Sequence, residues 1–229
     1  MDKNDFYNKI QITQEEKAKA DYFLDVRGIE EHIIVCDYLS NFKTEAITYA
    51  EVATALRYDK RIRRVIFKYI GFLEEKMRAY IANEYSDKVG SLQLIDELKD
   101  NVKNMSLYKA LSKLLFGRLV EQVKSLGKDE KELIFSNENI LNENLEAMCS
   151  LRNEISHNKF ILHQEFGNCS AGKKKSKSLC SNIKNIYYHL PINVRENFKK
   201  EINECSLYRE SDMNYQTDWN LIKKIIISI

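Results

Sequence analysis

The chain of 229 residues contains one proline and only seven glycines. These residues are the strongest breakers of regular structure, so their scarcity predicts long, uninterrupted helices. The sequence has no apolar run of 18 residues, which excludes a membrane-spanning helix, and its polar N-terminus has no hydrophobic signal core. The five cysteines are scattered and form no C-x-x-C pair, which indicates reduced thiols. We therefore expect a cytoplasmic protein that uses no metal or other cofactor.

The charges nearly balance, with 36 lysines and arginines against 34 acidic residues and a net charge of +2. This balance excludes a protein that is basic throughout, so any nucleic-acid footprint must be local. Hydrophobic residues make up 44% of the chain, enough for a substantial core, and the length fits one domain with extensions.

Apolar residues recur at helical spacing along most of the chain, and no segment alternates strongly as a strand would. Thr13 and Glu16 form a capping-box pattern that begins a helix to about Val26. Asp59 is interpreted as the N-cap of a long helix, separate from the short segment before it. Further helices are expected over 29–42, 49–58, 59–85, 107–123 with a break or close crossing at Gly117, 128–135, 137–157, 179–190, 194–205 and around Trp219. The pattern predicts an all-α fold.

The most informative stretch is the end of the predicted helix 137–157, which reads Leu-Arg-Asn-Glu-Ile-Ser-His-Asn from residue 151. Asn153 and His157 are four residues apart and share one helical face. Arg152 lies about 140° around the helix from His157, and its long side chain is expected to reach the same ligand.

These residue types suit the cleavage of RNA. Imidazole exchanges protons near neutral pH, and the planar guanidinium matches phosphate oxygens. An asparagine amide can orient the ring or donate to the phosphate, and RNA brings its own 2′-hydroxyl nucleophile. We therefore take Arg152, Asn153 and His157 as candidate catalytic residues that need no metal. The alternative is that they are surface residues at a helix end, where cations suit the helix dipole.

The residues after the motif have a different character. Residues 164–178 are rich in glycine, serine and lysine and are interpreted as a mobile basic loop. Lys173, Lys174, Lys175 and Lys177 could bind an RNA backbone there, and a solvated linker is an equally good interpretation. His163 follows the motif by six residues, and its sequence context assigns it no role.

Three blocks, in order and spacing over about residues 30–165, resemble the HEPN superfamily. More specifically, they look like its Abi-like branch, the AbiD/AbiF type of bacterial abortive-infection proteins. The first block is the helix from Asp59 to Arg78, the second is Leu115-Phe116-Gly117-Arg118-Leu119, and the third is the motif at 151–157, which is similar to the family's R-N-x-x-x-H form.

The resemblance implies a single domain over 1–229, built as a HEPN-like helical bundle with extra N- and C-terminal helices. Its core would span about 30–165 and its C-terminal extension about 175–229. It also implies a homodimer in which two copies of Arg152 and His157 line one cleft. Glu74 and Arg78 have the spacing of a helical ion pair, and the family pattern implies that they position Arg152 or His157.

The function implied by the resemblance is a metal-independent endoribonuclease. It would be a toxin of a bacterial phage-defence system, partnered with a small antitoxin RNA or another antitoxin. Two alternatives remain open at this point. One is a non-catalytic RNA-binding module that uses the same cleft, and the other is a helical partner-binding protein in which the motif is structural. Only the endoribonuclease needs the imidazole of His157 for chemistry.

Overall fold

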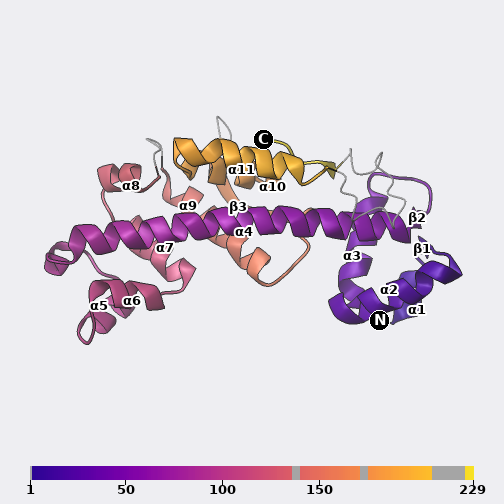
Figure 1. The fold of residues 1–229 in the computed structure, drawn as a ribbon, viewed down its shortest axis with the longest axis horizontal. Coiled ribbons are helices and arrows are strands. Elements are labelled where there is room, and N and C mark those ends of the chain that lie inside the picture. Colours follow the sequence, from indigo (N-terminus) through magenta and orange to yellow (C-terminus); the bar gives the residue numbers. More distant parts are fainter. Residues whose placement is uncertain (1, 136–139, 171–174, 208–224) are drawn as a thin grey trace.

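The computed structural model describes residues 2–135, 140–170, 175–207 and 225–229. In these ranges the chain is predominantly helical, which confirms the all-α fold class (Figure 1). The elements, in chain order, are α1 Lys3–Tyr7, β1 Ile10–Gln11, α2 Gln14–Arg27, α3 Ile29–Ser40, β2 Ile47–Thr48, α4 Tyr49–Tyr85, a 3-10 turn Val89–Ser91, α5 Asp96–Val102, α6 Leu107–Lys113, α7 Phe116–Lys124, α8 Lys128–Phe135, α9 Asn142–Ser156, β3 Glu165–Ser170, β4 Lys175–Ser178, α10 Leu179–His189 and α11 Ile192–Glu204.

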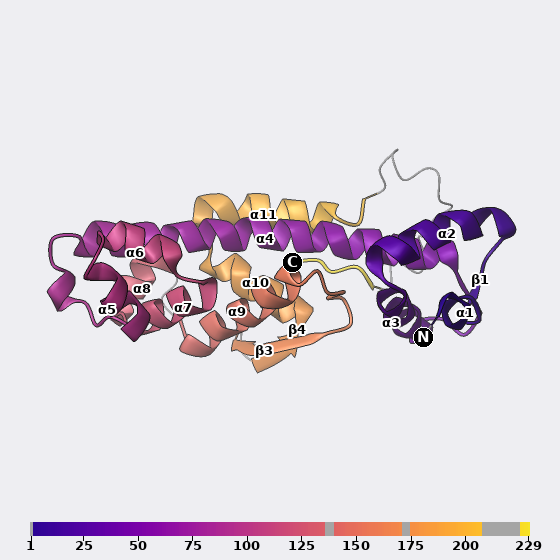
Figure 2. The same ribbon diagram turned by 90° about the horizontal axis from the view of Figure 1, so that it is seen from below.

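Helix α4 runs almost the whole length of the molecule, and at 37 residues it extends for about 55 Å (Figures 1 and 2). It begins where the side chains of Thr48 and Glu51 form a capping box that satisfies the first backbone N–H groups. The prediction that a new helix begins at Asp59 is therefore wrong. Asp59 lies inside α4 with its side chain fully buried, so its carboxylate serves another segment instead of a helix end.

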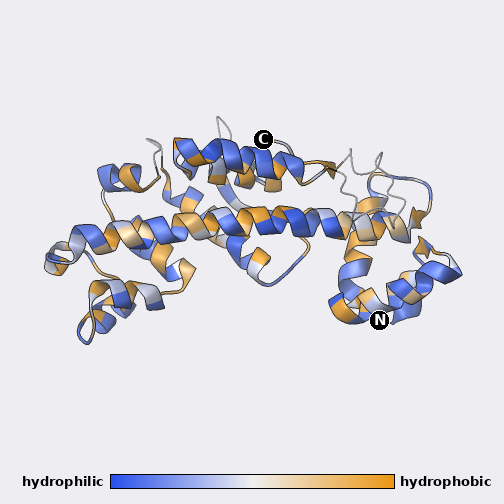
Figure 3. Cartoon of the chain, viewed as in Figure 1, coloured by the Kyte–Doolittle hydropathy of each residue, from blue (hydrophilic) through white to orange (hydrophobic). Residues whose placement is uncertain are grey.

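The other elements pack around α4. It contacts α3 at one end, α6 and α8 towards the other end, and α7, α9, α10 and α11 between them. Figure 2 shows α11 on one side of α4 and α9, α10 and the β3–β4 hairpin on the other. The buried apolar residues form one cluster that extends from Phe6 to Ile225, and Figure 3 shows the hydrophobic stripes of the helices. Among the described residues, no helix is long and apolar enough to cross a membrane.

Helices α9 and α4 run in opposite directions, as predicted. Arg152 lies against Phe67 of α4, whereas Asn158, just beyond the end of α9, bonds to Arg63. The residue number therefore falls along α4 as it rises along α9. The predicted helix start at Asn137 lies outside the described residues, as does the predicted helix around Trp219.

The predicted break near Gly117 is confirmed. Helix α6 ends at Lys113 and α7 begins at Phe116, so the predicted helix is two helices joined by a turn just before Gly117. A Cβ atom on Gly117 would lie 3.4 Å from Cys149 Sγ of α9, which shows that α7 and α9 approach each other closely here.

Residues 164–178 are not simply a mobile loop, which corrects the sequence interpretation. Strands β3 and β4 form an antiparallel hairpin that packs on α9. A Cβ atom on Gly167 would lie 2.7 Å from Ala147 Cα, so only glycine permits this contact. Ser170 N–H also donates to Asn144 Oδ1 at 2.8 Å. The strand signal was weak because these are short polar strands with an irregular register.

Candidate functional site

A cleft of about 750 Å³ opens beside the end of α9. Three parts of the chain build it, namely the corner between α2 and α3, one turn of α4, and the segment that follows α9. The lining residues are Val26, Arg27, Gly28, Glu30, Glu31, Ile34, Lys60, Arg63, His157, Asn158, Lys159, Phe160, His163 and Gln164. Its volume lies in the range of roughly 300–1,000 Å³ that is usual for ligand sites.

His157 is the C-cap of α9 and its side chain is exposed to the cleft. The helix ends here because Asn158 adopts a left-handed conformation with φ 56°. Asn158 N–H then donates to the Ile155 carbonyl at 3.0 Å, and Lys159 N–H donates to the Glu154 carbonyl at 3.2 Å. These are the two hydrogen bonds of a Schellman motif, in which asparagine sometimes replaces the usual glycine. The local fold of the motif therefore turns the chain sharply at the candidate catalytic imidazole.

The corner between α2 and α3 forms the opposite wall. Gly28 joins the two helices with φ 89°, a backbone conformation that glycine adopts far more readily than other residues. Its carbonyl accepts a hydrogen bond from His32 Nδ1 at 2.8 Å. The sharp corner brings Arg27 and Glu31 to the cleft, so the N-terminal helices contribute directly to the candidate site.

Cations outnumber carboxylates around the cleft. Within the described ranges, Lys159 pairs with Glu154 at 2.8 Å, whereas Arg27 and Lys60 form no such close pair. Burial raises the pKa of Glu31 in the same cleft, and the charges of Arg63 and Arg27 oppose this. Burial lowers the pKa of the Lys60 ammonium, and the nearby charges of Arg27, Arg64 and Arg63 lower it further. Like charges held together in this way repel one another, and a bound anion would relieve that repulsion.

Beneath the cleft, Asp59 and Arg63 form a buried ion pair with Nε to Oδ2 at 2.6 Å. The second carboxylate oxygen, Oδ1, accepts the Ile161 N–H at 2.7 Å, and Arg63 Nη1 donates to Asn158 Oδ1 at 3.3 Å. Burial raises the pKa of Asp59, while the Arg63 charge and the backbone donors act in the opposite direction. Both oxygens accept hydrogen bonds, as in an ionised carboxylate. The pair thereby fixes the segment after α9.

Of the three predicted catalytic residues, only His157 lines the cleft. The Arg152 guanidinium lies over the rings of Phe67 and Phe116, at 6.0 and 5.6 Å from their centroids. The Asn153 amide donates to Cys149 Sγ at 3.9 Å, one turn back along α9. The structure therefore does not bring Arg152 and His157 together in one cleft of a single chain.

The expectation that Glu74 and Arg78 position Arg152 or His157 also needs correction. Arg78 Nη2 pairs with Glu74 at 2.6 Å and donates to the Leu114 carbonyl at 2.8 Å, and Nη1 donates to the Leu111 carbonyl. The arginine thus caps the carbonyl end of α6. The half-buried pair attaches the α6–α7 turn to α4, and its link to Arg152 is indirect, through Phe116 of α7.

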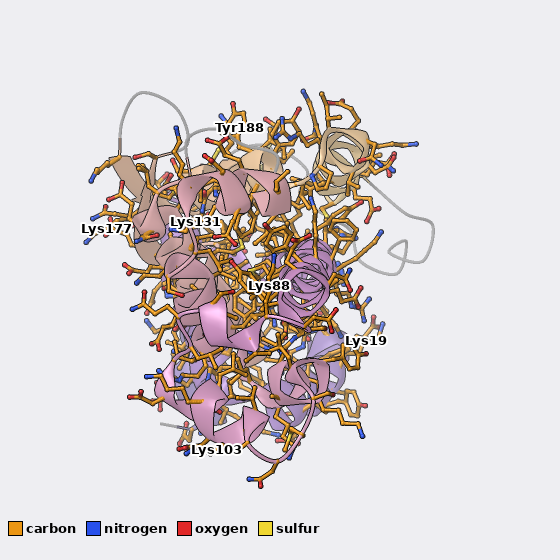
Figure 4. All side chains as sticks on the ribbon, turned by 90° about the vertical axis from the view of Figure 1, so that its left-hand side faces the viewer. Lys19, Lys88, Lys103, Lys131, Lys177 and Tyr188 are labelled. Carbon is orange, nitrogen blue, oxygen red and sulfur yellow. The ribbon has the colours of Figure 1, made fainter. Side chains whose placement is uncertain are left out.

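Two of the four predicted RNA-binding lysines fall within the described residues. Lys175 pairs with Glu143 of α9 at 2.6 Å, so its charge is locally balanced. Lys177 is exposed on β4 and is labelled in Figure 4 on the outer surface of the hairpin. Lys173 and Lys174 lie outside the described residues.

The sequence did not identify the cations of the cleft, Arg27, Lys60 and Arg63, and His163 was noted near the motif without an assigned role. Lys60 and Arg63 stand in one of the blocks quoted for the family resemblance, within α4, but their face of this helix was not predicted to meet the motif. His163 stacks on Phe160, with ring centroids 5.4 Å apart and planes at 18°. No pattern in the sequence pointed to Arg27, because it enters the site through the corner at Gly28.

Across the described part of the chain, no group of three or more His, Cys, Asp or Glu side chains could hold a metal ion. Comparisons with protein-family models, with curated proteins and with solved structures found no match for this chain.

Proposed function

We propose that this protein is a metal-independent endoribonuclease that acts as a growth-arresting toxin in bacterial phage defence. The observation that carries the proposal is the place of His157, an exposed imidazole in an open cleft beside Arg27 and Lys60. The imidazole can exchange protons with the 2′- and 5′-oxygens of RNA, and the cations suit the phosphate between them. The similarity of residues 151–157 to the HEPN motif supports the same chemistry.

In this proposal Arg152 does not act on the same phosphate as His157, which is the role that its sequence position implied. Its guanidinium lies beside exposed apolar side chains, since Phe67 is 49% exposed and Leu115, next to Phe116, is 76% exposed. An exposed aromatic ring beside a guanidinium fits a contact between two copies of the chain. We propose that Arg152 acts at a homodimer interface or binds RNA that extends beyond the cleft.

The test is to express the wild-type chain and His157→Ala in bacteria and to compare growth and RNA ends. Wild type should arrest growth and leave 2′,3′-cyclic phosphate and 5′-hydroxyl ends. His157→Ala should remain folded and bind RNA but lose cleavage, since acid–base help is worth about 10² to 10⁴ in rate. Purified wild type should keep cutting in excess chelator. Wild-type cleavage by the alanine variant, or loss of wild-type activity in chelator, contradicts the proposal.

The second candidate function is a non-catalytic RNA-binding module. The position of Arg152 favours it, because the arginine does not line the cleft that holds His157. Salt-dependent RNA binding without new RNA ends, in both the wild type and His157→Ala, would select this function.

A small antitoxin RNA, or another antitoxin, remains the proposed partner that restrains the toxin in the cell. We expect it to bind in the same cleft, because an RNA bound to the cations there would exclude the substrate RNA. Protection of Lys60 and Arg27 from chemical modification when that RNA is added would support this part of the proposal.

A further inference from the structure

Two imidazole rings, those of His157 and His163, line the same cleft of one chain. The segment between them is held at defined points. Asp59 accepts the Ile161 N–H at 2.7 Å, and the His163 ring stacks on Phe160. These contacts fix the backbone between the two rings, and proton-transfer groups must be held in position in this way.

We infer that His163 is a second catalytic residue, so that one chain carries both the base and the acid for RNA cleavage. This inference rests on the function proposed above and deepens it. It removes the need to borrow an imidazole from a second copy. A homodimer would then hold two complete clefts instead of one shared cleft.

The reaction is a transesterification that needs no oxidant, reductant or metal. One ring takes the proton of the 2′-hydroxyl as the 2′-oxygen forms a bond to phosphorus. The bond between phosphorus and the 5′-oxygen breaks, and the other, protonated ring gives its proton to the leaving oxygen. The products are a 2′,3′-cyclic phosphate and a 5′-hydroxyl. Proton exchange with water returns both rings to their starting states.

We take His163 as the base, and the other ring of the cleft, His157, is then the acid. Burial lowers the pKa of His163, against a hydrogen bond with the Phe160 backbone that raises it, so the neutral ring is favoured. A neutral ring accepts a proton, whereas the acid must begin protonated. The charged groups that face the rings from the surrounding elements are Arg27, Glu30, Glu31, Lys60, Arg63 and Lys159.

Lys60 and Arg27 supply the phosphate contact. Both line the cleft, and the pKa of Lys60 is lowered by burial and then by the charges of Arg27, Arg64 and Arg63. Each phosphate contact contributes about 0.7 of a unit to the salt slope of single-strand binding. Lys60→Gln should lower the slope by about that amount and weaken binding, with no change in the RNA ends produced.

The decisive experiment compares two substrates with the purified full chain. One is a dinucleotide, and the other is a nucleoside 3′-(4-nitrophenyl phosphate), whose leaving group needs no acid. His163→Ala should cut the dinucleotide about 10² to 10⁴ times more slowly and should not be rescued by the nitrophenyl ester. His157→Ala should be equally slow on the dinucleotide and should recover on the ester. Rescue of His163→Ala in place of His157→Ala overturns the assignment of base and acid.

His163→Phe separates chemistry from packing, because phenylalanine keeps the ring stack on Phe160 but cannot exchange a proton. It should be as slow as His163→Ala and should lose one limb of the wild-type pH–rate profile. Wild-type activity in either variant overturns the catalytic role of His163. A wild-type chain that never cuts RNA instead refutes the proposed function, so the two failures are distinguishable.

Co-expression of His157→Ala with His163→Ala tests whether one chain holds the whole site. If each cleft belongs to one chain, every cleft in a mixed assembly lacks one ring and no cleavage should return. Recovery of about a quarter or more of the wild-type rate, as for a site shared between chains, overturns the single-chain inference.

Discussion

Helix α4 carries two ion pairs of the same local pattern, Asp59–Arg63 and Glu74–Arg78. In each, an acid precedes an arginine by four residues, and the nitrogen–oxygen distance is 2.6 Å. Each pair also reaches from α4 to the backbone of another segment. Asp59 accepts an N–H from the segment after α9, whereas Arg78 donates to carbonyls at the end of α6.

The two pairs differ in burial and in what they hold. Asp59 is 0% and Arg63 is 9% exposed, while Glu74 and Arg78 are 23% and 18% exposed. The buried pair supports the segment that carries His163, and the half-buried pair supports a turn between two helices. The same sequence pattern can therefore serve a candidate site or the fold alone, and the tertiary neighbour decides which.

The largest expected effect comes from Asp59→Asn. The substitution leaves the Arg63 charge buried without its partner, which should lower the free energy of unfolding by about 3–5 kcal/mol. RNA cleavage per folded molecule should also fall, because the single amide oxygen of asparagine cannot accept from both Arg63 and the Ile161 N–H. Urea denaturation measures the first effect, and cleavage at a fixed folded concentration measures the second.

A double variant, Asp59→Leu with Arg63→Met, is the matched control. Removing both charges should recover most of the stability lost in Asp59→Asn, since a buried ion pair can be replaced by apolar residues at little cost. Cleavage should remain impaired because leucine offers the Ile161 N–H no acceptor. Recovery of stability and cleavage together would show that Asp59 does not position the cleft.

Arg78→Met should have a smaller effect. It removes the arginine donor from both carbonyls, but Leu111 still accepts the Leu114 N–H at 3.1 Å. Only the Leu114 carbonyl loses its donor, and one unsatisfied group costs about 1–3 kcal/mol. Cleavage per folded molecule should not change, because these bonds hold α6 and not the cleft. Urea denaturation and the same cleavage assay check both statements.

Glu74→Gln is the control for this variant, since it removes the ion pair but leaves Arg78 bound to the carbonyls. It should cost less than Arg78→Met. A loss of cleavage in either variant beyond the unfolded fraction would favour the role that the family resemblance implied, in which this pair positions Arg152 or His157.

The comparison also explains how much the sequence could predict. The helices at 128–135 and 179–190, the capping box at Thr13 and the all-α class follow from local patterns, and the structure confirms them. Local rules gave a wrong result at Asp59. An aspartate at the start of a helical pattern resembles an N-cap, and only the tertiary structure shows that its carboxylate accepts an N–H from a distant segment. The partner, Ile161, is separated from it by 102 positions in the chain.

The candidate site was predictable in the same uneven way. His157 was found because the motif around it is local, and its place in the cleft agrees with the role proposed for it. Arg27, Lys60 and His163 meet only when α2, α4 and the segment after α9 come together. The helical period could place Arg152 away from His157, but it could not show that Phe67 and Phe116 would hold its guanidinium there.

The smallest expected effect tests the turn between the motif and the buried pair. Asn158 is the one residue other than glycine with a positive φ among those that the structure describes, and its Oδ1 accepts from Arg63 at 3.3 Å. Asn158→Ala should lower the free energy of unfolding by about 1 kcal/mol, because the left-handed conformation is less favourable for alanine than for asparagine. Asn158→Gly loses the same oxygen, but glycine adopts the left-handed conformation without strain. Its stability should therefore stay within about 0.5 kcal/mol of the wild type.

Comparing these two variants separates backbone conformation from the Arg63 contact. If the turn alone positions the cleft, Asn158→Gly should keep the wild-type cleavage rate and Asn158→Ala should lose part of it. If the hydrogen bond to Arg63 matters, both variants should lose cleavage equally, since both lack Oδ1. We expect the first result, because 3.3 Å is long for a hydrogen bond to a guanidinium, and the anchor at Ile161 is 2.7 Å and buried. Equal losses would extend the role of the buried pair from Ile161 to the turn that carries His157.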